Sequence, residues 1–235
     1  MLKDKIVLIT GGSSGIGAET AKLFALKGAK VVITYKTNKK GADEIVKEIR
    51  GIGGGALAIK ADLTKDINAK KAVEVVIKKF GRIDVLINNA GRYINGDEWN
   101  GLAKIWLKSL EQNLISVMSM SKYVTKHFLK QKSGIIVNIA SRYSKDGQFD
   151  SISYAAAKAG VANVTEAYAK LLKPIGGRAN TVSPHATRAG YWLTAPKEEL
   201  GGKTLIEPIE VAKKILFLAS DESKDITGQN FFVGE

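Results

Sequence analysis

The stretch Lys5–Gly17, KIVLITGGSSGIG, joins a run of apolar, mostly β-branched residues to a glycine-rich turn. A continuous apolar run of this length predicts a strand that is buried on both faces, and the glycines end it. Between this turn and Gly28, the spacing of four residues predicts one face of a helix: Ile16, Thr20, Leu23 and Phe24. Residues 30–34, KVVIT, return to the pattern of a buried strand. The stretch therefore predicts a βαβ unit.

The same alternation continues through the rest of the chain. It predicts strands at 56–60, 85–88, 134–140, 179–183 and 231–233, and helices around 42–49, 67–80, 102–132, 153–172 and 210–219. Nearly continuous apolar strands between helices are typical of a parallel sheet that is covered on both faces. We predict an α/β fold, a doubly wound parallel sheet of about seven strands (a Rossmann fold), in a single domain over residues 1–235. Residues 186–207 form its one long irregular insertion.

Composition excludes several classes of protein. The chain is 45% hydrophobic and has only 4 prolines, which favours a packed core over disorder. It has no cysteine, so disulfides, thiolate metal sites and a cysteine nucleophile are excluded, and we expect no metal site. The apolar run at the start of the chain is too short for a membrane span and has no cleavage site, so we expect a cytoplasmic protein without a membrane partner.

The formal net charge of +13 raises the question of a nucleic-acid partner. The lysines are spread in pairs along the chain, with no arginine-rich arm and no strip that alternates basic and aromatic residues. This pattern favours a solvated lysine surface and no nucleic-acid site. A nucleic-acid-binding protein on this fold remains an alternative.

The glycine-rich turn has a chemical interpretation. Between a strand and a helix, Gly11, Gly15 and Gly17 let the backbone approach a pyrophosphate, which the N–H groups at the helix N-terminus then bind. The other interpretation is an ordinary tight turn, but the position of the loop at the start of an alternating chain favours a dinucleotide site.

The end of the second strand predicts which dinucleotide is bound. An acidic residue there would bind the ribose 2′-hydroxyl of NAD(H), but the sequence is Tyr35, Lys36, Thr37, Asn38 and Lys39. A basic edge suits a 2′-phosphate, so NADP(H) is preferred and NAD(H) stays possible. Alternatively, Lys36 and Lys39 belong to the general lysine surface.

Tyr154 and Lys158 are four residues apart in a predicted helix and so lie on one face. A tyrosine is a poor acid/base group at neutral pH unless a neighbouring ammonium favours its phenolate, which Lys158 could provide. Ser141 follows the apolar strand 134–140, at the edge of the sheet where ligands of such folds bind.

With these residues in place, the chain resembles the short-chain dehydrogenase/reductase family, in its single-domain branch. It is similar to the 3-oxoacyl-(acyl-carrier-protein) reductases and the sugar dehydrogenases within that family. The motifs that carry the resemblance cover nearly the whole chain: Thr10-Gly11-x3-Gly15-x-Gly17, Asp62-Leu63, Asn88-Asn89-Ala90-Gly91, Asn113, Ser141, Tyr154-x3-Lys158 and Asn180-x3-Pro184.

The resemblance implies an oxidoreductase that transfers a hydride between a nicotinamide and a carbonyl or alcohol, with Tyr154 as acid/base. Lys158 would lower the Tyr154 pKa and hold the nicotinamide ribose, Ser141 would bind the substrate oxygen, and Asn113 would support a water relay. Asp62 would contact adenine, and Asn88 and Gly91 the adenosine ribose. The full expected cofactor site is Gly11, Ser13, Ser14, Gly15, Ile16, Gly17, Tyr35, Lys36, Thr37, Asp62, Leu63, Asn89, Ala90, Gly91, Tyr154, Lys158, Pro184 and Thr187.

Several residues depart from the family pattern. His185 follows Pro184 where the family has glycine, Ala189 replaces a threonine that Thr187 could substitute, and Ser14 stands where NADP-preferring relatives often have a basic residue. A histidine at a position that needs positive φ is uncommon, so a rearranged loop is possible. His185 itself is either a surface side chain or a group that acts on substrate.

The insertion 186–207 corresponds to the family's substrate lid and is short, which favours a small substrate or an open site. Candidate substrate contacts are Arg142, His185, Tyr191 and Trp192. The family also implies a homo-oligomer, a tetramer or dimer, assembled through helices at 102–132 and 153–172. A non-catalytic dinucleotide-sensing module is an alternative function, although such a module has no need of the tyrosine, lysine, serine and asparagine together.

Overall fold

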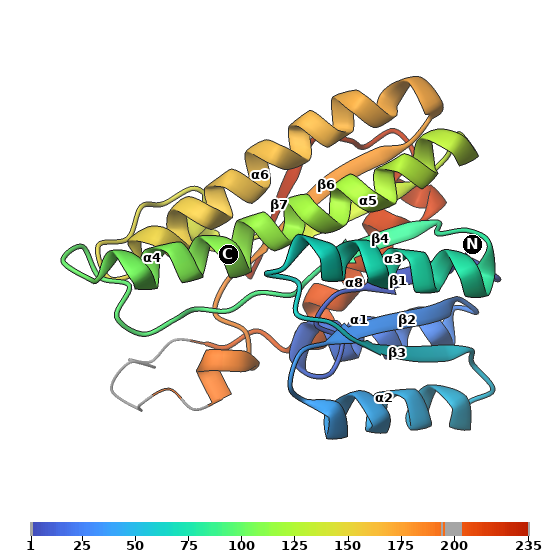
Figure 1. The fold of residues 1–235 in the computed structure, drawn as a ribbon, viewed down its shortest axis with the longest axis horizontal. Helices are drawn as coiled ribbons and strands as arrows, with labels where there is room; N and C mark the ends of the chain where they lie inside the picture. Colours follow the sequence, from blue (N-terminus) through green and yellow to red (C-terminus); the bar gives the residue numbers. More distant parts are fainter. Residues whose placement is uncertain (1, 194, 196–203, 235) are drawn as a thin grey trace.

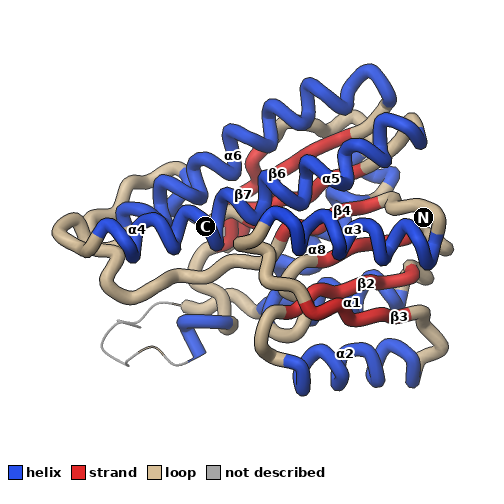
Figure 2. The backbone as a smooth tube through the Cα atoms, in the orientation of Figure 1, coloured by secondary structure: helices blue, strands red, loops and turns tan. Residues whose placement is uncertain are grey.

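In the computed structural model of the protein, residues 2–193, 195 and 204–234 are described, and they form one seven-stranded sheet between two layers of helices (Figures 1 and 2). All strand pairs are parallel, in the order β3-β2-β1-β4-β5-β6-β7. The strands are β1 Ile6–Ile9, β2 Lys30–Tyr35, β3 Ala56–Lys60, β4 Val85–Asn88, β5 Ile135–Ile139, β6 Arg178–Pro184 and β7 Asn230–Val233. The predicted fold class is confirmed.

Helices cover both faces of the sheet because both faces are apolar. One core cluster joins the sheet to α1 (Gly15–Leu26), α2 (Lys39–Gly51) and α8 (Pro208–Ala219). A second joins the opposite face to α3 (Asp66–Phe80), α5 (Ser116–Gln131) and α6 (Ile152–Leu172), the helices nearest the viewer in Figure 1. Every residue of β1 and β4 is buried, which explains their continuous apolar runs.

The strand order determines where a ligand can bind. From β1 the chain runs outward through β2 and β3, and then crosses back to β4 on the other side of β1. Loops that leave β1 and β4 therefore diverge and open a crevice at the carboxyl ends of the strands, which is where open α/β sheets bind ligands.

The predicted helix over 102–132 is three elements. α4 (Ala103–Leu110) and α5 are joined by η1 (Glu111–Ile115), one turn of π-helix. Such turns insert a residue into a helix and are frequent at functional sites. The prediction of a single helix is therefore wrong in detail, and the extra turn carries Asn113.

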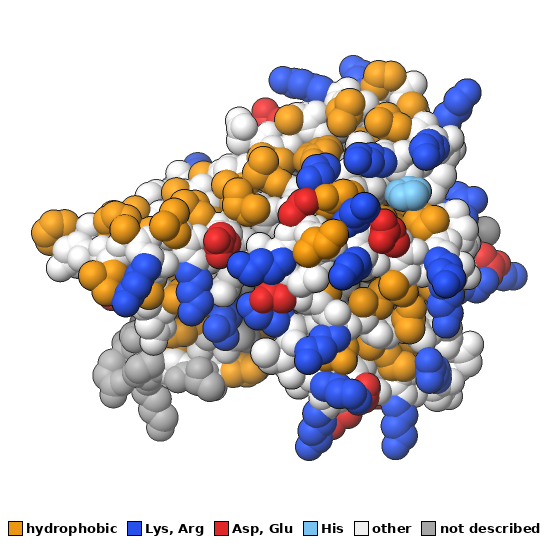
Figure 3. All heavy atoms as spheres, viewed as in Figure 1, with side chains coloured by type: hydrophobic (Ala, Val, Ile, Leu, Met, Phe, Trp, Pro, Cys, Tyr) orange, Lys and Arg blue, Asp and Glu red, His pale blue; other side chains and the backbone are white. Residues whose placement is uncertain are grey.

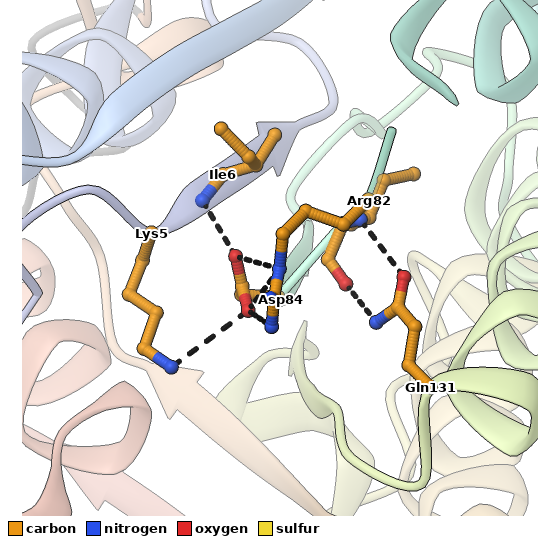
Figure 4. Close-up of polar contacts among 6 residues, drawn as sticks. Lys5, Ile6, Arg82, Asp84 and Gln131 are labelled. Atoms are coloured by element: carbon orange, nitrogen blue, oxygen red, sulfur yellow. Dashed lines mark hydrogen bonds and ion pairs between the residues drawn. The ribbon is translucent and has the colours of Figure 1, made fainter. Parts of the chain in front are cut away.

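A buried carboxylate ties the amino ends of β1 and β4 together, at the end of the sheet opposite the crevice (Figure 4). Asp84 accepts hydrogen bonds from the Ile6 amide, at 2.8 Å, and from the Arg82 guanidinium, at 2.5 and 3.0 Å. The side-chain amide of Gln131 accepts a hydrogen bond from the Ile83 backbone N–H, at 3.2 Å, and donates one to the Ile83 backbone carbonyl, at 2.7 Å. This network stabilises the fold away from the site.

The insertion 186–207 contains a short 3-10 helix, η4 (Gly190–Leu193), and an isolated bridge between Thr187 and Ile206 joins its two ends. Residues 194 and 196–203 of the predicted lid lie outside the described residues. The described residues also include three further 3-10 turns, η2 Arg142–Ser144, η3 Lys173–Ile175 and η5 Asp221–Ser223.

On the face shown in Figure 3, lysine and arginine side chains are spread among acidic ones, with no single basic patch. None of the helices in the described part of the chain is both long and apolar enough to cross a membrane.

Candidate active site

A cleft of about 800 Å³ opens at the carboxyl ends of the strands. It is lined by all the predicted cofactor residues except Gly17, by the catalytic candidates Ser141, Tyr154 and Lys158, and by the substrate candidates Arg142, His185, Tyr191 and Trp192. Asn113 is buried beside the cleft. Asn88 does not line it, because its amide donates to Ser121 and Asn138 within the sheet layer. The predicted role of Asn88 at the ribose is therefore not supported by its position.

The glycine-rich loop adopts a backbone that its glycines make possible. Gly11 and Gly15 have positive φ, 67° and 55°. A Cβ at Gly17 would lie 2.4 Å from the Gly11 carbonyl oxygen, so Gly17 lets α1 begin directly against the loop. The Asn89 amide donates to the carbonyls of Thr10 and Gly11 and holds the loop to β4. The N-terminus of α1 then faces the cleft, in the arrangement that binds a pyrophosphate.

At the end of β2, Lys36 forms an ion pair of 2.8 Å with Asp62. Burial acts to raise the pKa of Asp62, but hydrogen bonds from Lys36 and Thr64 outweigh it and lower that pKa. Thr37 lines the cleft beside Lys36, whereas Lys39 pairs with Asp43 within α2. Among the described residues that line the cleft at the end of β2, Lys36 is the lysine that a ligand could contact, and it is already ion-paired with Asp62.

Tyr154 lies in the first turn of α6, and Ser141 lies just past the end of β5, after Ala140. Burial raises the pKa of the Tyr154 phenol to about 12, while a hydrogen bond with Ser141 acts in the opposite direction. The phenol is consequently protonated at neutral pH. The predicted lowering of this pKa by Lys158 is not observed in this structure, because the effect of burial dominates.

Lys158 is only 3% exposed, and its ammonium nitrogen lies 5.6 Å from the Tyr154 ring centroid. It donates a 2.8 Å hydrogen bond to the Ile139 carbonyl, and burial lowers its pKa to about 8. A buried ammonium one helical turn from a phenol can still favour the phenolate through its charge.

Asn113 lies in the π-turn η1, where its amide nitrogen donates to the carbonyls of Arg92 and Ser109 at 2.9 and 3.0 Å. Its Oδ1 is buried and has no hydrogen-bond partner among the described residues. A Cβ at Gly91, where φ is 153°, would lie 2.6 Å from this oxygen and 3.5 Å from Lys158 Nζ. Gly91 therefore leaves open the space between the free Asn113 acceptor and the lysine.

Asp97, which sequence analysis did not identify, fixes the first turn of α6. It is fully buried, and its carboxylate accepts the Ser153 amide at 3.1 Å, the Ser153 hydroxyl, and the Tyr154 amide at 2.8 Å. Its backbone carbonyl accepts the Ile152 amide. Ser151, at the N-cap position, makes no capping bond through its side chain. The cap thus comes from a residue more than fifty positions away, and no local motif could have revealed it.

Aromatic rings surround Tyr154 at the substrate end of the cleft. The rings of Tyr93 and Tyr143 meet it edge-to-face, with centroids 6.2 and 6.3 Å away. Tyr191 packs against Tyr93 at 5.3 Å and against Trp192 at 5.5 Å. Sequence analysis missed Tyr93 and Tyr143, although each follows a motif residue closely.

The segment after Pro184 does not need the left-handed backbone that a glycine would suit. His185 has no positive φ, and its amide donates to the Val233 carbonyl, which extends the pairing of β6 with β7. The Thr187 hydroxyl donates to the His185 carbonyl at 2.9 Å. Ala189 lies against Gly15, where a Cβ on the glycine would approach it to 2.9 Å. The two departures from the family pattern are thus accommodated without backbone strain.

The description "short chain dehydrogenase" belongs to the family model that matches residues 5–199 of this chain. The chain belongs to the short-chain dehydrogenase/reductase family. It is 38% identical to the 3-oxoacyl-[acyl-carrier-protein] reductase of Synechocystis sp. over 99% of this chain and 96% of the relative. It is also 35% identical to the cis-4-hydroxycyclohexanecarboxylate dehydrogenase of Sinomonas cyclohexanicum, over 96% and 93%.

A solved structure of this family is also similar. A variant of actinorhodin polyketide ketoreductase, crystallised with NADPH, matches with a TM-score of 0.90 and 29% identity over 98% of this chain and 95% of that one. The protein is therefore an oxidoreductase of the family, whose members bind NAD(P)(H) and act on carbonyl or alcohol groups.

Proposed function

We propose that this protein is an NADP(H)-dependent oxidoreductase that reduces a carbonyl compound, or oxidises the corresponding secondary alcohol, with Tyr154 as the acid/base. The observation that carries the proposal is the Tyr154 phenol, which lines the same cleft as Ser141 and whose ring centroid lies 5.6 Å from the buried Lys158 ammonium. Bound NADP(H) supplies the hydride to the substrate carbon or accepts it from there.

The side chains divide the work on the substrate oxygen. With a pKa near 12, Tyr154 holds its proton at neutral pH and donates it to a carbonyl oxygen as negative charge develops there. The Ser141 hydroxyl hydrogen-bonds the same oxygen and stabilises that charge. In alcohol oxidation Tyr154 must accept the proton, and the Lys158 ammonium favours the phenolate that does so. The high pKa supports reduction as the easier direction near pH 7.

Lys158 and Asn113 extend this arrangement away from the substrate. The free Oδ1 of Asn113 faces the space that Gly91 leaves beside Lys158 Nζ, which supports a water-mediated proton relay to the lysine. The family resemblance implies the same role for these residues.

The basic edge after β2 supports NADP(H) over NAD(H). The cofactor residues fit a dinucleotide, because the glycine loop has positive φ at Gly11 and Gly15 and is directly followed by α1. Lys36 and Thr37 line the cleft where the adenosine 2′-phosphate would bind. The relative that was solved with NADPH supports the same choice.

The relatives' names do not select a substrate for this chain. One names a 3-oxoacyl-[acyl-carrier-protein] and another a cis-4-hydroxycyclohexanecarboxylate. The aromatic rings around Tyr154 support a small or flat ketone. We also propose a homo-oligomer, because apolar side chains gather over α4, α5 and α6 on the face shown in Figure 3.

The test is turnover by Tyr154→Phe in a panel of small ketones, cyclic ketones and acyl thioesters, followed by NADPH absorbance. Loss of the phenol proton should lower kcat by about 10²- to 10⁴-fold and leave the Kd for NADPH unchanged. Tyr168→Phe is the matched control, since that hydroxyl lies on the same helix and contacts Met118 instead of the cleft. A Tyr154→Phe enzyme that retains more than half of the wild-type kcat would refute the mechanism, and NADPH binding without any turnover would favour the sensing module.

A further inference from the structure

Arg142 is a partly buried cation in the substrate end of the cleft, and none of the described residues forms an ion pair with it. Its Nε is buried without a hydrogen-bond partner, and no ion pair to its guanidinium occurs among the described residues. Arg178, the other arginine of low exposure, is fully satisfied by contrast: its guanidinium donates to Leu218, Ser220 and Ser223. Burying a guanidinium is costly unless an acceptor compensates for it.

The position of Arg142 indicates where such an acceptor would come from. Arg142 follows Ser141 directly, and its guanidinium carbon lies 5.4 Å from the Tyr143 ring centroid. The Tyr143 ring in turn lies edge-to-face with Tyr154. The cation and the proposed proton donor thus both lie near the Tyr143 ring, and all three side chains line the same cleft.

The other charged groups of the lining leave this cation available. Asp62 is at the adenosine end, where it pairs with Lys36. Asp150 is the one other carboxylate among the described lining residues, and its Oδ1 accepts the Ser151 hydroxyl at 3.1 Å without an ion pair to Arg142. Lys158 is engaged by the Ile139 carbonyl. Arg92 and His185 also line the cleft, and neither contributes negative charge.

From this arrangement we infer that the substrate is a ketone, or its alcohol, on a flat or cyclic body that carries a carboxylate, and that Arg142 binds this carboxylate. The inference rests on the proposed function and names its substrate class. Tyr93, Tyr143 and Tyr191 contact the body of the substrate, and the planar guanidinium pairs with the two carboxylate oxygens. The reacting carbonyl and the carboxylate lie about one ring apart, as they do in a para-substituted aryl ketone.

The test compares two probes of nearly the same shape, the anion 4-acetylbenzoate and the neutral amide 4-acetylbenzamide, in the NADPH-loaded enzyme. Wild type should reduce the carboxylate with the higher kcat/KM. Arg142→Gln should lower kcat/KM for the carboxylate by about 10- to 100-fold and change that for the amide by less than about threefold. Arg142→Lys should recover only part of the loss, because it keeps the charge without the fork of donors. The Kd for NADPH should be the same in all variants.

Lys145→Gln is the matched control, since Lys145 is a cation near Arg142 in the chain whose ammonium lies over Phe232 and not in the cleft lining. It separates direct binding from the general attraction of a basic protein for anions. The inference is overturned if Arg142→Gln affects both probes equally, if Lys145→Gln reproduces its effect, or if Arg142→Gln weakens NADPH binding instead.

Calorimetric binding of 4-acetylbenzoate to the NADPH-loaded enzyme separates this inference from the proposed function. Weaker binding in Arg142→Gln, with no NADPH consumed by wild type on any ketone, would refute the oxidoreductase and support the anion site. Turnover of ketones with unchanged binding of the carboxylate in Arg142→Gln would do the reverse.

Discussion

Lys36 already has a partner within the protein, and a cofactor phosphate must compete for it. The lysine pairs with Asp62 at 2.8 Å at the end of β2. Both side chains are partly exposed, so the pair itself is worth little and can open or share its cation. A 2′-phosphate brings a second negative charge to the same ammonium, whereas a ribose 2′-hydroxyl does not.

Lys36→Gln should therefore weaken NADPH binding by about tenfold while changing the Kd for NADH by less than about twofold, as measured by cofactor fluorescence. The matched control is Lys39→Gln, because Lys39 is close in the chain but pairs with Asp43 outside the cleft. Wild type that binds NADH tenfold more tightly than NADPH would contradict the assigned cofactor preference.

Some residues of the candidate site could be predicted from the sequence, and others could not. The glycines and the Tyr154–Lys158 pair could be predicted because their chemistry depends on spacing along a single turn or helix. The state of Arg142 could not, because a missing partner is a property of everything packed around it. Likewise the pKa of Tyr154 depends on burial, which the spacing to Lys158 does not determine.

At the level of elements, Asp97 couples the loop after β4 to the helix that carries Tyr154. The loop is also joined to the segment before α6 by the Tyr93 hydroxyl, which donates to the Asp150 carbonyl, and by the Trp99 amide, which donates to the Phe149 carbonyl. The loop and the first turn of α6 therefore form one hydrogen-bonded unit at the substrate end of the cleft.

Asp97→Asn should destabilise the fold by about 1.5–3 kcal/mol, because its NH2 group cannot accept both first-turn amides. It should also lower kcat per NADPH-binding site by about 10- to 100-fold, because the Tyr154 backbone loses its anchor. Chemical denaturation and steady-state kinetics measure the two effects. Asp146→Asn, at an exposed position in the loop before α6, should do neither. An Asp97→Asn enzyme with full kcat would limit Asp97 to a structural role.

The π-turn at η1 shows what periodicity leaves out. Apolar residues through 102–132 are compatible with one continuous helix, and the prediction followed them. The inserted residue rotates the side chains of α5 relative to those of α4. It also directs the Asn113 amide toward the carbonyls of Arg92 and Ser109. One of these acceptors, the Arg92 carbonyl, belongs to the loop after β4, and the helical sequence itself carries no sign of that contact.

At the level of the whole molecule, the face formed by η1 and α5 bears exposed apolar side chains, including Ile115 at 44% and Met118 at 40% exposure. Burial against a second copy would remove them from water. Sedimentation velocity should show wild type as a dimer or tetramer and Ile115→Lys/Met118→Lys as a smaller species. Leu26→Lys, at an exposed apolar position of α1 on the other side of the sheet, should leave the assembly unchanged. A monomeric wild type would contradict this prediction.

The architecture was the most predictable level. Alternating buried strands and helices imply a parallel sheet with two covered faces, whichever residues fill the loops. The strand order and the exact edge of each helix depend on packing between distant segments, and the described part of 186–207 owes its form to a bridge from Thr187 to Ile206.

The Asp84 network has a practical meaning for engineering this enzyme. It holds β1 and β4 together at the amino ends of the strands, while the side chains that face a substrate extend from loops at the opposite ends. Directed evolution could therefore randomise Arg142, Tyr191 and Trp192 in a library while the Asp84 contacts stay untouched. Substrate scope and robustness would then be two separate objectives of selection.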